Sequence, residues 1–407
     1  MKIRSVHTAV GLSGFAHKDL AGIKTGAPGN GFFYDGRPVT PGFSEISQES
    51  RVLSVMLRLE DGNIAHGDCL DVIFAGAAGR DRPFAPEEHL ETFDALVRPW
   101  LEKIDPAAFR ANAEAFEARV ETSSLHMALR YGVSQALLHA ASLVRGVTMA
   151  EVVAADYGTT PGTALVPILV SIPKTDPLVL DRMIMKRADL LPHASFTVVE
   201  TDLGPDGHLI LDYARGLSDR IAAVGAKDYQ PTIHLDTYGT IGEMTGNNIE
   251  KITAFLGRLS QAASPYRLYI ESPIIAPTQD EQIRLYAELR RSIAAAGLPI
   301  RLIVDEWCNT LEDIRRFHAE KAADMVQIKA PDLGGIGNTI EALIYCRENG
   351  IGCCLGGTAN DTDQSSRIAT HLALACGADF LLGRPGLGGD AALMIMRNEM
   401  ARTLALL

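Results

Sequence analysis

Four ionisable residues follow short apolar runs at nearly regular intervals in the second half of the chain. Asp236 ends Thr-Ile-His-Leu-Asp, Glu271 ends Leu-Tyr-Ile-Glu, Asp305 ends Leu-Ile-Val-Asp, and Lys329 follows Met-Val-Gln-Ile. The intervals are about 35, 34 and 24 residues, each close to one βα unit of a parallel barrel. Because the carboxyl ends of such strands meet on one face, we expect the three acids and the lysine to lie together there.

This set of residue types indicates metal-assisted proton abstraction. Three carboxylates buried together are costly unless a cation neutralises them, and an all-oxygen set suits Mg²⁺, with Mn²⁺ as the alternative. The ion would stabilise an enolate, and a lysine whose pKa is lowered by burial and by the cation would act as the base. A single strand-end acid is more often a helix cap or a surface ion-pair partner, but three in register, followed by Lys329, argue against coincidence.

Strand alternation adds two residues to this face. Side chains two positions apart in a strand share a side, so Gln327 points with Lys329 and His234 with Asp236. Gln327 could donate a hydrogen bond to a substrate carboxylate. We favour a packing role inside the barrel for His234.

The elements that position these residues alternate from about Thr163 onward. Eight short apolar runs, separated by amphipathic helical segments, are expected as strands at Ala164–Val170, Ala194–Val199, Thr232–Leu235, Arg267–Ile270, Leu302–Val304, Met325–Ile328, Gly352–Leu355 and Asp379–Leu382. The fold class is therefore α/β, a (β/α)8-type barrel over residues 161–407, preceded by an N-terminal α+β capping domain over residues 1–160. A doubly wound sheet is the alternative, but no Gly-rich phosphate turn follows its first strand.

The first 160 residues have a different pattern. Lys2–Leu12 is expected as a strand, and Arg51–Leu59 and Asn63–Leu70 as a hairpin around Glu60-Asp-Gly62. Helical periodicity covers Pro86–Lys103, Pro106–Val120 and Leu125–Val144. The Gly- and Pro-rich stretch 26–42 carries Phe32, Phe33 and Tyr34; it is either a lid with an aromatic tip or an ordinary surface loop.

Composition excludes several classes of protein. The 407 residues carry a formal net charge of −12, and the absence of a Lys/Arg cluster argues against nucleic acid as the main partner. We expect no membrane span and no signal peptide. The six cysteines lack both metal-finger spacing and disulfide-scaffold density, so a cytoplasmic location in a reducing environment is expected.

Several long runs resemble those of the methylaspartate ammonia-lyases of the enolase superfamily, over nearly the whole chain. They are His66–Cys69, Gly76–Asp81, Leu125–Gly132, Thr148–Val152, Leu191–His193, Asp236–Gly242, Asp305–Thr310, Gln327–Gly335 and Gly356–Thr358. The resemblance implies a Mg²⁺-dependent elimination of ammonia from a small amino diacid, by a homodimer or larger oligomer.

The resemblance also implies roles for single residues. Asp236, Glu271 and Asp305 would be the metal ligands, and Lys329 the base on one face of the substrate. His193 would face the substrate from the other side, with a packing role as its alternative. Gln327 would bind the carboxylate held by the metal, and Thr358 the other carboxylate.

Three positions depart from the family pattern. Where the family has Gln, Gln and Cys, this chain has Ser171, Ile73 and Ala359; Leu382, at the end of the last expected strand, is a further candidate substrate contact. A site that loses hydrogen-bonding groups loses discrimination for the polar group they held. We therefore expect weak or no activity on 3-methylaspartate and a different or less polar substrate.

Other activities keep part of this chemistry. A hydroxy-acid or acid-sugar dehydratase would share the enolate step, and a racemase would need two bases, which Lys329 and His193 could supply. A metal-binding scaffold without turnover is the alternative from another class, and the retention of all four strand-end residues speaks against it.

Overall fold

The computed structural model describes residues 1–120 and 125–407. Within these ranges, eight parallel strands close into a barrel in which strands consecutive in sequence are also neighbours in space. They are β6 (Ile168–Leu169), β7 (Leu190–Ser195), β8 (Thr232–Asp236), β9 (Arg267–Glu271), β10 (Ile300–Val304), β11 (Met325–Ile328), β12 (Gly352–Leu355) and β13 (Phe380–Leu382). The barrel class expected from the sequence is confirmed.

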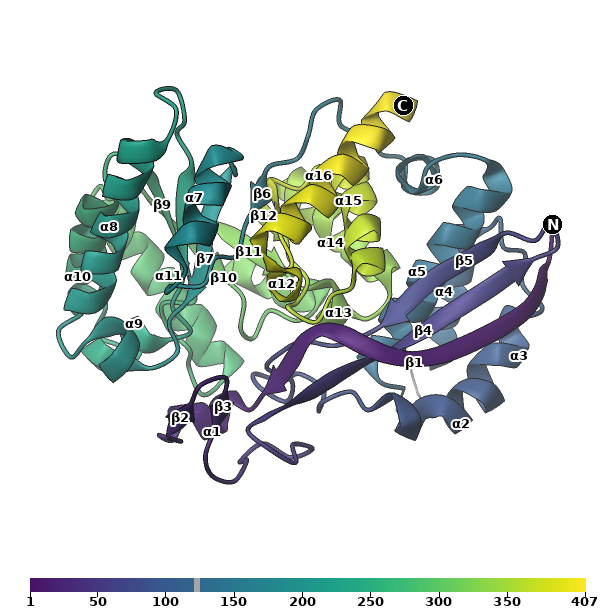
Figure 1. The fold of residues 1–407 in the computed structure, drawn as a ribbon, viewed down its shortest axis with the longest axis horizontal. Coiled ribbons are helices and arrows are strands. Elements are labelled where there is room, and N and C mark those ends of the chain that lie inside the picture. The colour runs from purple at the N-terminus through teal and green to yellow at the C-terminus, as the bar shows by residue number, and fades with distance from the viewer. Residues whose placement is uncertain (121–124) are drawn as a thin grey trace.

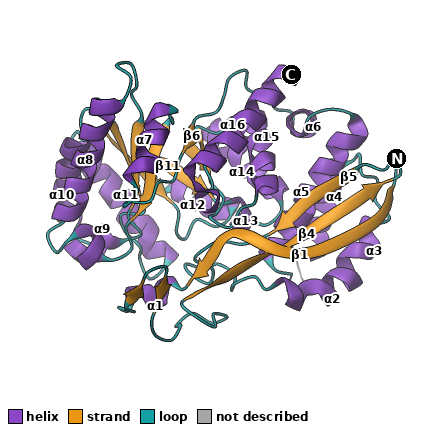
Figure 2. Ribbon diagram, viewed as in Figure 1, coloured by secondary structure: helices purple, strands orange, loops and turns teal. Residues whose placement is uncertain are grey.

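Helices surround the barrel strands, as the purple and orange ribbons of Figure 2 show. They are α7 (Pro177–Met185), α8 (His208–Val224), α9 (Thr240–Thr245), α10 (Ile249–Ala263), α11 (Gln279–Ala295), α12 (Leu311–Ala319), α13 (Ala330–Leu333), α14 (Ile336–Asn349), α15 (Asp363–Cys376) and α16 (Gly388–Leu406). The helix between the acid and the lysine, α12, begins at a capping box in which Thr310 and Asp313 bond each other's backbone N–H, which satisfies donors that a helix start leaves unpaired.

A three-stranded antiparallel sheet forms the core of the N-terminal part, with order β1 (Ile3–Lys18), β4 (Ser47–Leu59) and β5 (Ile64–Cys69). Its helices are α1 (Leu20–Lys24), α2 (Leu90–Thr92), α3 (Arg98–Leu101), α4 (Phe109–Val120), α5 (Met127–Arg145) and α6 (Met149–Tyr157). A Cβ added at Gly67 of β5 would lie 2.1 Å from the carbonyl oxygen of Gly132 in α5. Glycine therefore lets this strand and helix pack backbone to backbone.

The far end of β1 reaches the barrel (Figure 1). There it continues into α1 and a short hairpin of β2 (Gly29–Asn30) and β3 (Phe33–Tyr34). The Lys24 ammonium of α1 donates to the carbonyl oxygen of Tyr238, 2.8 Å away, just past β8. This contact ties the segment to the carboxyl end of the barrel.

Three expected elements differ from the structure. The second barrel strand lies at Leu190–Ser195 and not at Ala194–Val199. Proline is uncommon inside strands, so Pro192 argued against a strand at the correct position. The expected helix Pro86–Lys103 is helical from Pro86 to Leu101, but the helix type changes along it: a π-helical turn at Phe93–Val97 precedes α3, which begins at Arg98. Pro99, in the first turn of α3, lacks the N–H that a regular helix interior needs. The first strand extends beyond Leu12 to Lys18.

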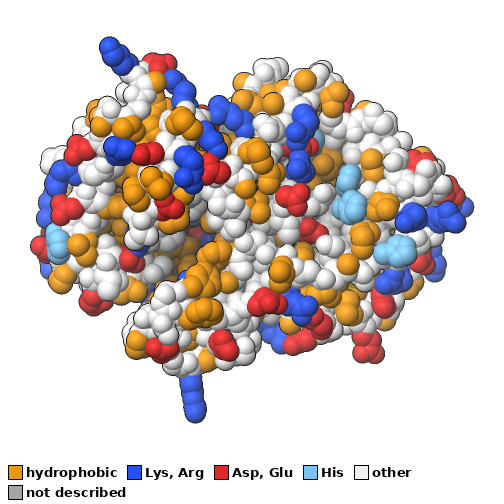
Figure 3. All heavy atoms as spheres, viewed as in Figure 1, with side chains coloured by type: hydrophobic (Ala, Val, Ile, Leu, Met, Phe, Trp, Pro, Cys, Tyr) orange, Lys and Arg blue, Asp and Glu red, His pale blue; other side chains and the backbone are white. Residues whose placement is uncertain are grey.

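The surface carries no sign of a polyanion-binding patch on the face drawn in Figure 3, where acidic and basic side chains are interspersed. Across the described residues, no single helix is long and apolar enough to span a bilayer; α5 and α6 meet that criterion only as a pair bent by 97°.

Candidate active site

The four strand-end residues meet at one end of the barrel. Asp236 and Glu271 are the last residues of β8 and β9 and are direct neighbours in the register of these strands. Asp305 and Lys329 follow β10 and β11 directly, and the Lys329 ammonium donates to Oδ2 of Asp305. The three carboxylates are each about 1% exposed. Parallel strand order therefore brings together residues that are far apart in sequence.

Electrostatics at this end of the barrel favour a bound cation. Four acids are buried, namely Asp236, Glu271, Asp305 and Glu306, and the cations beside them are Lys329 and Arg80. Burial and the neighbouring carboxylates raise the pKa of Asp236 well above its usual value, and its Oδ2 atom has no hydrogen-bond partner among the described residues. With all four acids ionised, they would exceed the two cations by two negative charges. That excess and the unpaired carboxylate oxygen fit a divalent metal ion.

The pKa of Lys329 shifts in the opposite direction from the one expected from the sequence. Burial alone lowers the pKa of Lys329, but the carboxylates of Asp305 and Glu306 raise it, and the net direction is upward from its ordinary value. Burial and a metal ion, which the sequence led us to expect, would both lower this pKa. The protein's own acids oppose that shift, so a neutral amine requires that these acids be offset by a cation.

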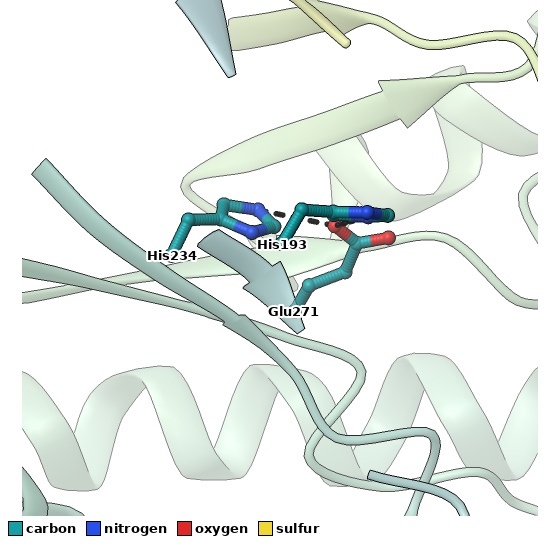
Figure 4. Close-up of side chains that lie close together, drawn as sticks. All are labelled: His193, His234 and Glu271. Carbon is teal, nitrogen blue, oxygen red and sulfur yellow. Dashed lines mark ion pairs between the residues drawn. The ribbon is translucent and has the colours of Figure 1, made fainter. Parts of the chain in front are cut away.

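Two histidines lie against the Glu271 carboxylate (Figure 4). Nε2 of His234 is 3.1 Å from Oε2 of Glu271, and Nε2 of His193 is 3.8 Å from the same oxygen. Burial lowers the pKa of His193 to about 4 and that of His234 to about 3, so both rings are neutral at pH 7. In the described part of the chain, this trio is the one group of His, Cys, Asp and Glu whose ligand atoms all lie within 4.8 Å of one another.

His234 and His193 have different surroundings. His234 is fully buried, with its ring 6.1 Å from that of Phe380, inside the barrel among strand side chains. The ring nitrogens of both histidines lack a hydrogen-bond partner among the residues described, but His193 is the one of the two that lines the cavity. The packing role expected for His234 fits this position, while His193 is free to meet a ligand.

A cavity of about 350 Å³ opens above these residues, where the surface in Figure 3 is hollowed between the barrel and the N-terminal segment. Every candidate site residue from the sequence lines it except Asp305, which lies beneath Lys329. These lining residues are Ile73, Ser171, His193, Asp236, Glu271, Gln327, Lys329, Thr358, Ala359 and Leu382.

Among the polar side chains that line this cavity are Thr358 and Gln327. The Thr358 hydroxyl oxygen accepts hydrogen bonds from the backbone N–H groups of Ile73, at 3.2 Å, and Asn360, at 3.3 Å. Its own hydrogen is therefore available to a ligand. The Gln327 amide nitrogen donates to the Glu271 carboxylate at 3.3 and 3.4 Å.

Part of the cavity lining is apolar, and we call this part the apolar wall. Ile73, Phe74 and Leu382 line it together with the small side chains Ser171 and Ala359. The three positions at which the sequence is expected to depart from the family pattern, Ile73, Ser171 and Ala359, thus all line one cavity.

Sequence reasoning assigned no role to Arg80 or Glu306. The Arg80 guanidinium reaches from the N-terminal part to Oδ1 of Asp305, at 3.2 Å, and to Oδ2 of Asp332, at 2.7 Å. Glu306 accepts a hydrogen bond from the Ser272 hydroxyl. The one signal for Arg80 was its place in the Gly-rich run Gly76–Asp81, which is one of the runs that carry the family resemblance.

Backbone strain is concentrated at the same end of the barrel. Left-handed φ angles occur at His193 (45°), Tyr238 (41°), Ser272 (48°) and Trp307 (64°), in or just past four consecutive strands. Each such residue costs about 1–3 kcal/mol and persists where surrounding contacts impose it. The strands turn sharply here, which brings side chains over the barrel mouth.

The family described as "Methylaspartate ammonia-lyase N-terminus" matches residues 1–158, and "Methylaspartate ammonia-lyase C-terminus" matches residues 162–407. The chain belongs to the methylaspartate ammonia-lyase family. It is 44% identical over 409 residues to methylaspartate ammonia-lyase 2 of Carboxydothermus hydrogenoformans, covering 100% of this chain and 99% of that relative. The family assignment makes the chain a lyase of the enolase superfamily.

Solved methylaspartate ammonia-lyase structures share the whole fold. The magnesium complex of β-methylaspartase from Clostridium tetanomorphum superposes with a TM-score of 0.91 at 40% identity, covering 100% of this chain and 99% of that one. The Citrobacter amalonaticus enzyme containing (2S,3S)-3-methylaspartic acid gives 0.94 at 39% identity, with the same coverage.

Proposed function

We propose that this protein is a Mg²⁺-dependent ammonia-lyase that acts on an amino diacid other than 3-methylaspartate. The observation that carries the proposal is the cluster of Asp236, Glu271, Asp305 and Lys329 at the ends of β8 to β11. Asp236, Glu271 and Lys329 line the cavity there, as does His193. Mn²⁺ has the same preference for oxygen ligands and is the alternative ion.

Asp236, Glu271 and Asp305 would hold the ion. When bound, Mg²⁺ supplies positive charge that stabilises an enolate and offsets the carboxylates that otherwise keep Lys329 protonated. The histidines beside Glu271 offer nitrogen atoms, which suit zinc or other transition metals better than magnesium. The acid trio is therefore our proposed magnesium set, and His193 is kept for the substrate.

Each side chain of this site would have one role in proton transfer or in substrate binding. Lys329 accepts the proton from the carbon next to one substrate carboxylate, the electron pair forms a carbon–carbon double bond, and the carbon–nitrogen bond breaks to release ammonia. Gln327 would donate to the carboxylate whose neighbouring carbon loses the proton. Thr358 would donate its free hydroxyl hydrogen to the second carboxylate. His193 would accept the proton from the epimer that presents its opposite face.

The apolar wall supports divergence from 3-methylaspartate. Ile73 and Ser171 replace two amides that could bind the polar end of that substrate, and Ala359 and Leu382 add no hydrogen-bonding side chain. A site that lacks the matching groups binds a polar substrate less well. The full-length relatives are ammonia-lyases, so a dehydratase or racemase is not favoured.

The proposal is tested by incubating the purified protein with Mg²⁺ and a panel of amino diacids and following the ultraviolet absorbance of unsaturated products. We expect product from at least one diacid and little from 3-methylaspartate. Rapid turnover of 3-methylaspartate would refute the divergence, and no product or proton exchange from any acid would refute the lyase. The domain division at residue 160, a homo-oligomeric state and a cytoplasmic location stay predictions.

A further inference from the structure

We infer that Lys18 is a specificity-determining residue that binds a third acidic group on the substrate, so that the preferred substrate is an amino diacid that carries one further carboxylate. This inference deepens the proposed function and rests on it for the chemistry at Lys329. It is carried by the position and the surroundings of the Lys18 side chain.

Lys18 lies beside the apolar wall. It is the last residue of β1 and lines the cavity, and its backbone N–H donates to the carbonyl oxygen of Ile73 at 2.8 Å. The cation is therefore anchored next to one of the positions that depart from the family pattern. Position 73 has an isoleucine instead of the expected glutamine, and the positively charged Lys18 lies next to it.

The Lys18 ammonium has an aromatic environment. Its Nζ atom lies 4.2 Å from the ring centre of Phe32 and 5.4 Å from that of Tyr34, on the hairpin that follows α1. Both rings attract a cation through their π faces, which holds the ammonium in place without neutralising it. The aromatic residues of the stretch 26–42 thus have a defined contact with a cavity residue.

No carboxylate of the described residues lies within ion-pair distance of Lys18. The neighbouring acid, Asp19, accepts instead from the backbone N–H groups of Val39 and Thr40, at 2.5 and 3.1 Å, and from the Thr40 hydroxyl, at 2.6 Å. Burial lowers the pKa of Lys18 because the ammonium loses hydration. An anion on the ligand would compensate for that loss.

The other two lysines of the cavity are already paired. Lys174 contacts Asp202, and Lys329 contacts Asp305. Lys18 is thus the cavity lysine, among the residues described, that can receive a ligand anion. A single ammonium matches one singly charged carboxylate better than a phosphate, which carries nearly two charges and three acceptor oxygens. The apolar surface of Ile73 and Phe74 would contact the methylene groups that lead to this carboxylate.

Binding of unreactive analogues tests the inference without requiring turnover. Calorimetry in Mg²⁺ would compare butane-1,2,4-tricarboxylate with propylsuccinate, which has the same carbon skeleton without the third acid. We expect wild type to bind the tricarboxylate at least about tenfold more tightly, and Lys18→Met to lose that preference with little change for propylsuccinate. Lys103→Met, at an exposed lysine, is the matched control and should behave as wild type.

Turnover separates the inference from the proposed function. A tricarboxylate preference lost in Lys18→Met, with no elimination from any amino acid, would support the binding role and overturn the lyase. Equal binding of the two analogues by wild type, or an unchanged preference in Lys18→Met, would overturn the role of Lys18 even if elimination occurs. A parallel pair, N-(2-carboxyethyl)aspartate and N-propylaspartate, shows whether the third acid is attached through nitrogen; a preference for the former also supports the inference.

Discussion

The floor of the cavity and its apolar wall differ in the kind of side chain that each presents to a substrate. The floor presents charged groups, and the wall presents apolar or short side chains. The floor comes from the ends of β8 to β11, where Asp236, Glu271 and Asp305 are buried and Lys329 pairs with Asp305. The wall comes mostly from loops, with Leu382 at the end of β13, and it contains the three positions at which we expect a departure from the family pattern. Chemistry is thus placed on rigid strands, and recognition on segments that tolerate substitution.

This comparison predicts that changes in the floor abolish the reaction, whereas changes in the wall alter the choice of substrate. The largest effect is expected from metal removal. A chelator should eliminate turnover, and added Mg²⁺ should restore it. Because a ligand at 100 times its Kd stabilises a fold by about 2.7 kcal/mol, Mg²⁺ should also raise the melting temperature.

Asp236→Asn should lose this thermal shift, and Glu320→Gln, an exposed acid at the end of α12, should keep it. If turnover persists after complete chelation, the reaction does not depend on a metal ion bound by the acids of the floor.

The next largest effect is expected at Lys329. Lys329→Ala should lower kcat by about 10²–10⁴, the usual contribution of general base catalysis, with an unchanged circular dichroism spectrum. Lys329→Arg keeps the charge but cannot be deprotonated, and should be nearly as inactive. An active arginine variant would mean that the residue acts as a charge and not as a base.

A smaller effect is expected from restoring amides to the wall. Ile73→Gln combined with Ser171→Gln should raise kcat/KM for 3-methylaspartate by at least about tenfold, because the amides can bond its polar groups. Ile73→Leu is the apolar control and should leave this value low. If the double variant gains nothing, the wall does not set the preference.

The smallest effect is expected at Thr358. Thr358→Val removes the hydroxyl hydrogen available to a carboxylate, and one hydrogen bond contributes about 0.5–1.5 kcal/mol. KM should rise by roughly two- to tenfold while kcat stays within about twofold, and Thr358→Ser should restore KM. An unchanged KM in steady-state assays would remove Thr358 from substrate binding.

The sequence predicted the barrel and the residues of its floor because strand order alone determines them. Each of Asp236, Glu271, Asp305 and Lys329 lies one βα unit from the next, so parallel closure brings them to one end. The second strand was misplaced because Pro192 lies inside it.

Long-range contacts could not be predicted in the same way. Arg80 reaches Asp305 across 225 positions, and no periodicity connects them. The contact of Lys18 with Phe32 and Tyr34 depends on how β1 and its hairpin meet the barrel. The direction of the pKa shift of Lys329 was missed for the same reason, because it depends on Glu306 and Asp305 at close range.

The most direct measurement is deuterium incorporation next to the carboxylate, followed by nuclear magnetic resonance in heavy water with Mg²⁺ and the amino diacid panel. Wild type should incorporate deuterium into at least one diacid or convert it to the unsaturated product, and Lys329→Ala should do neither. Equal incorporation by wild type and Lys329→Ala would contradict the assignment of Lys329 as the base.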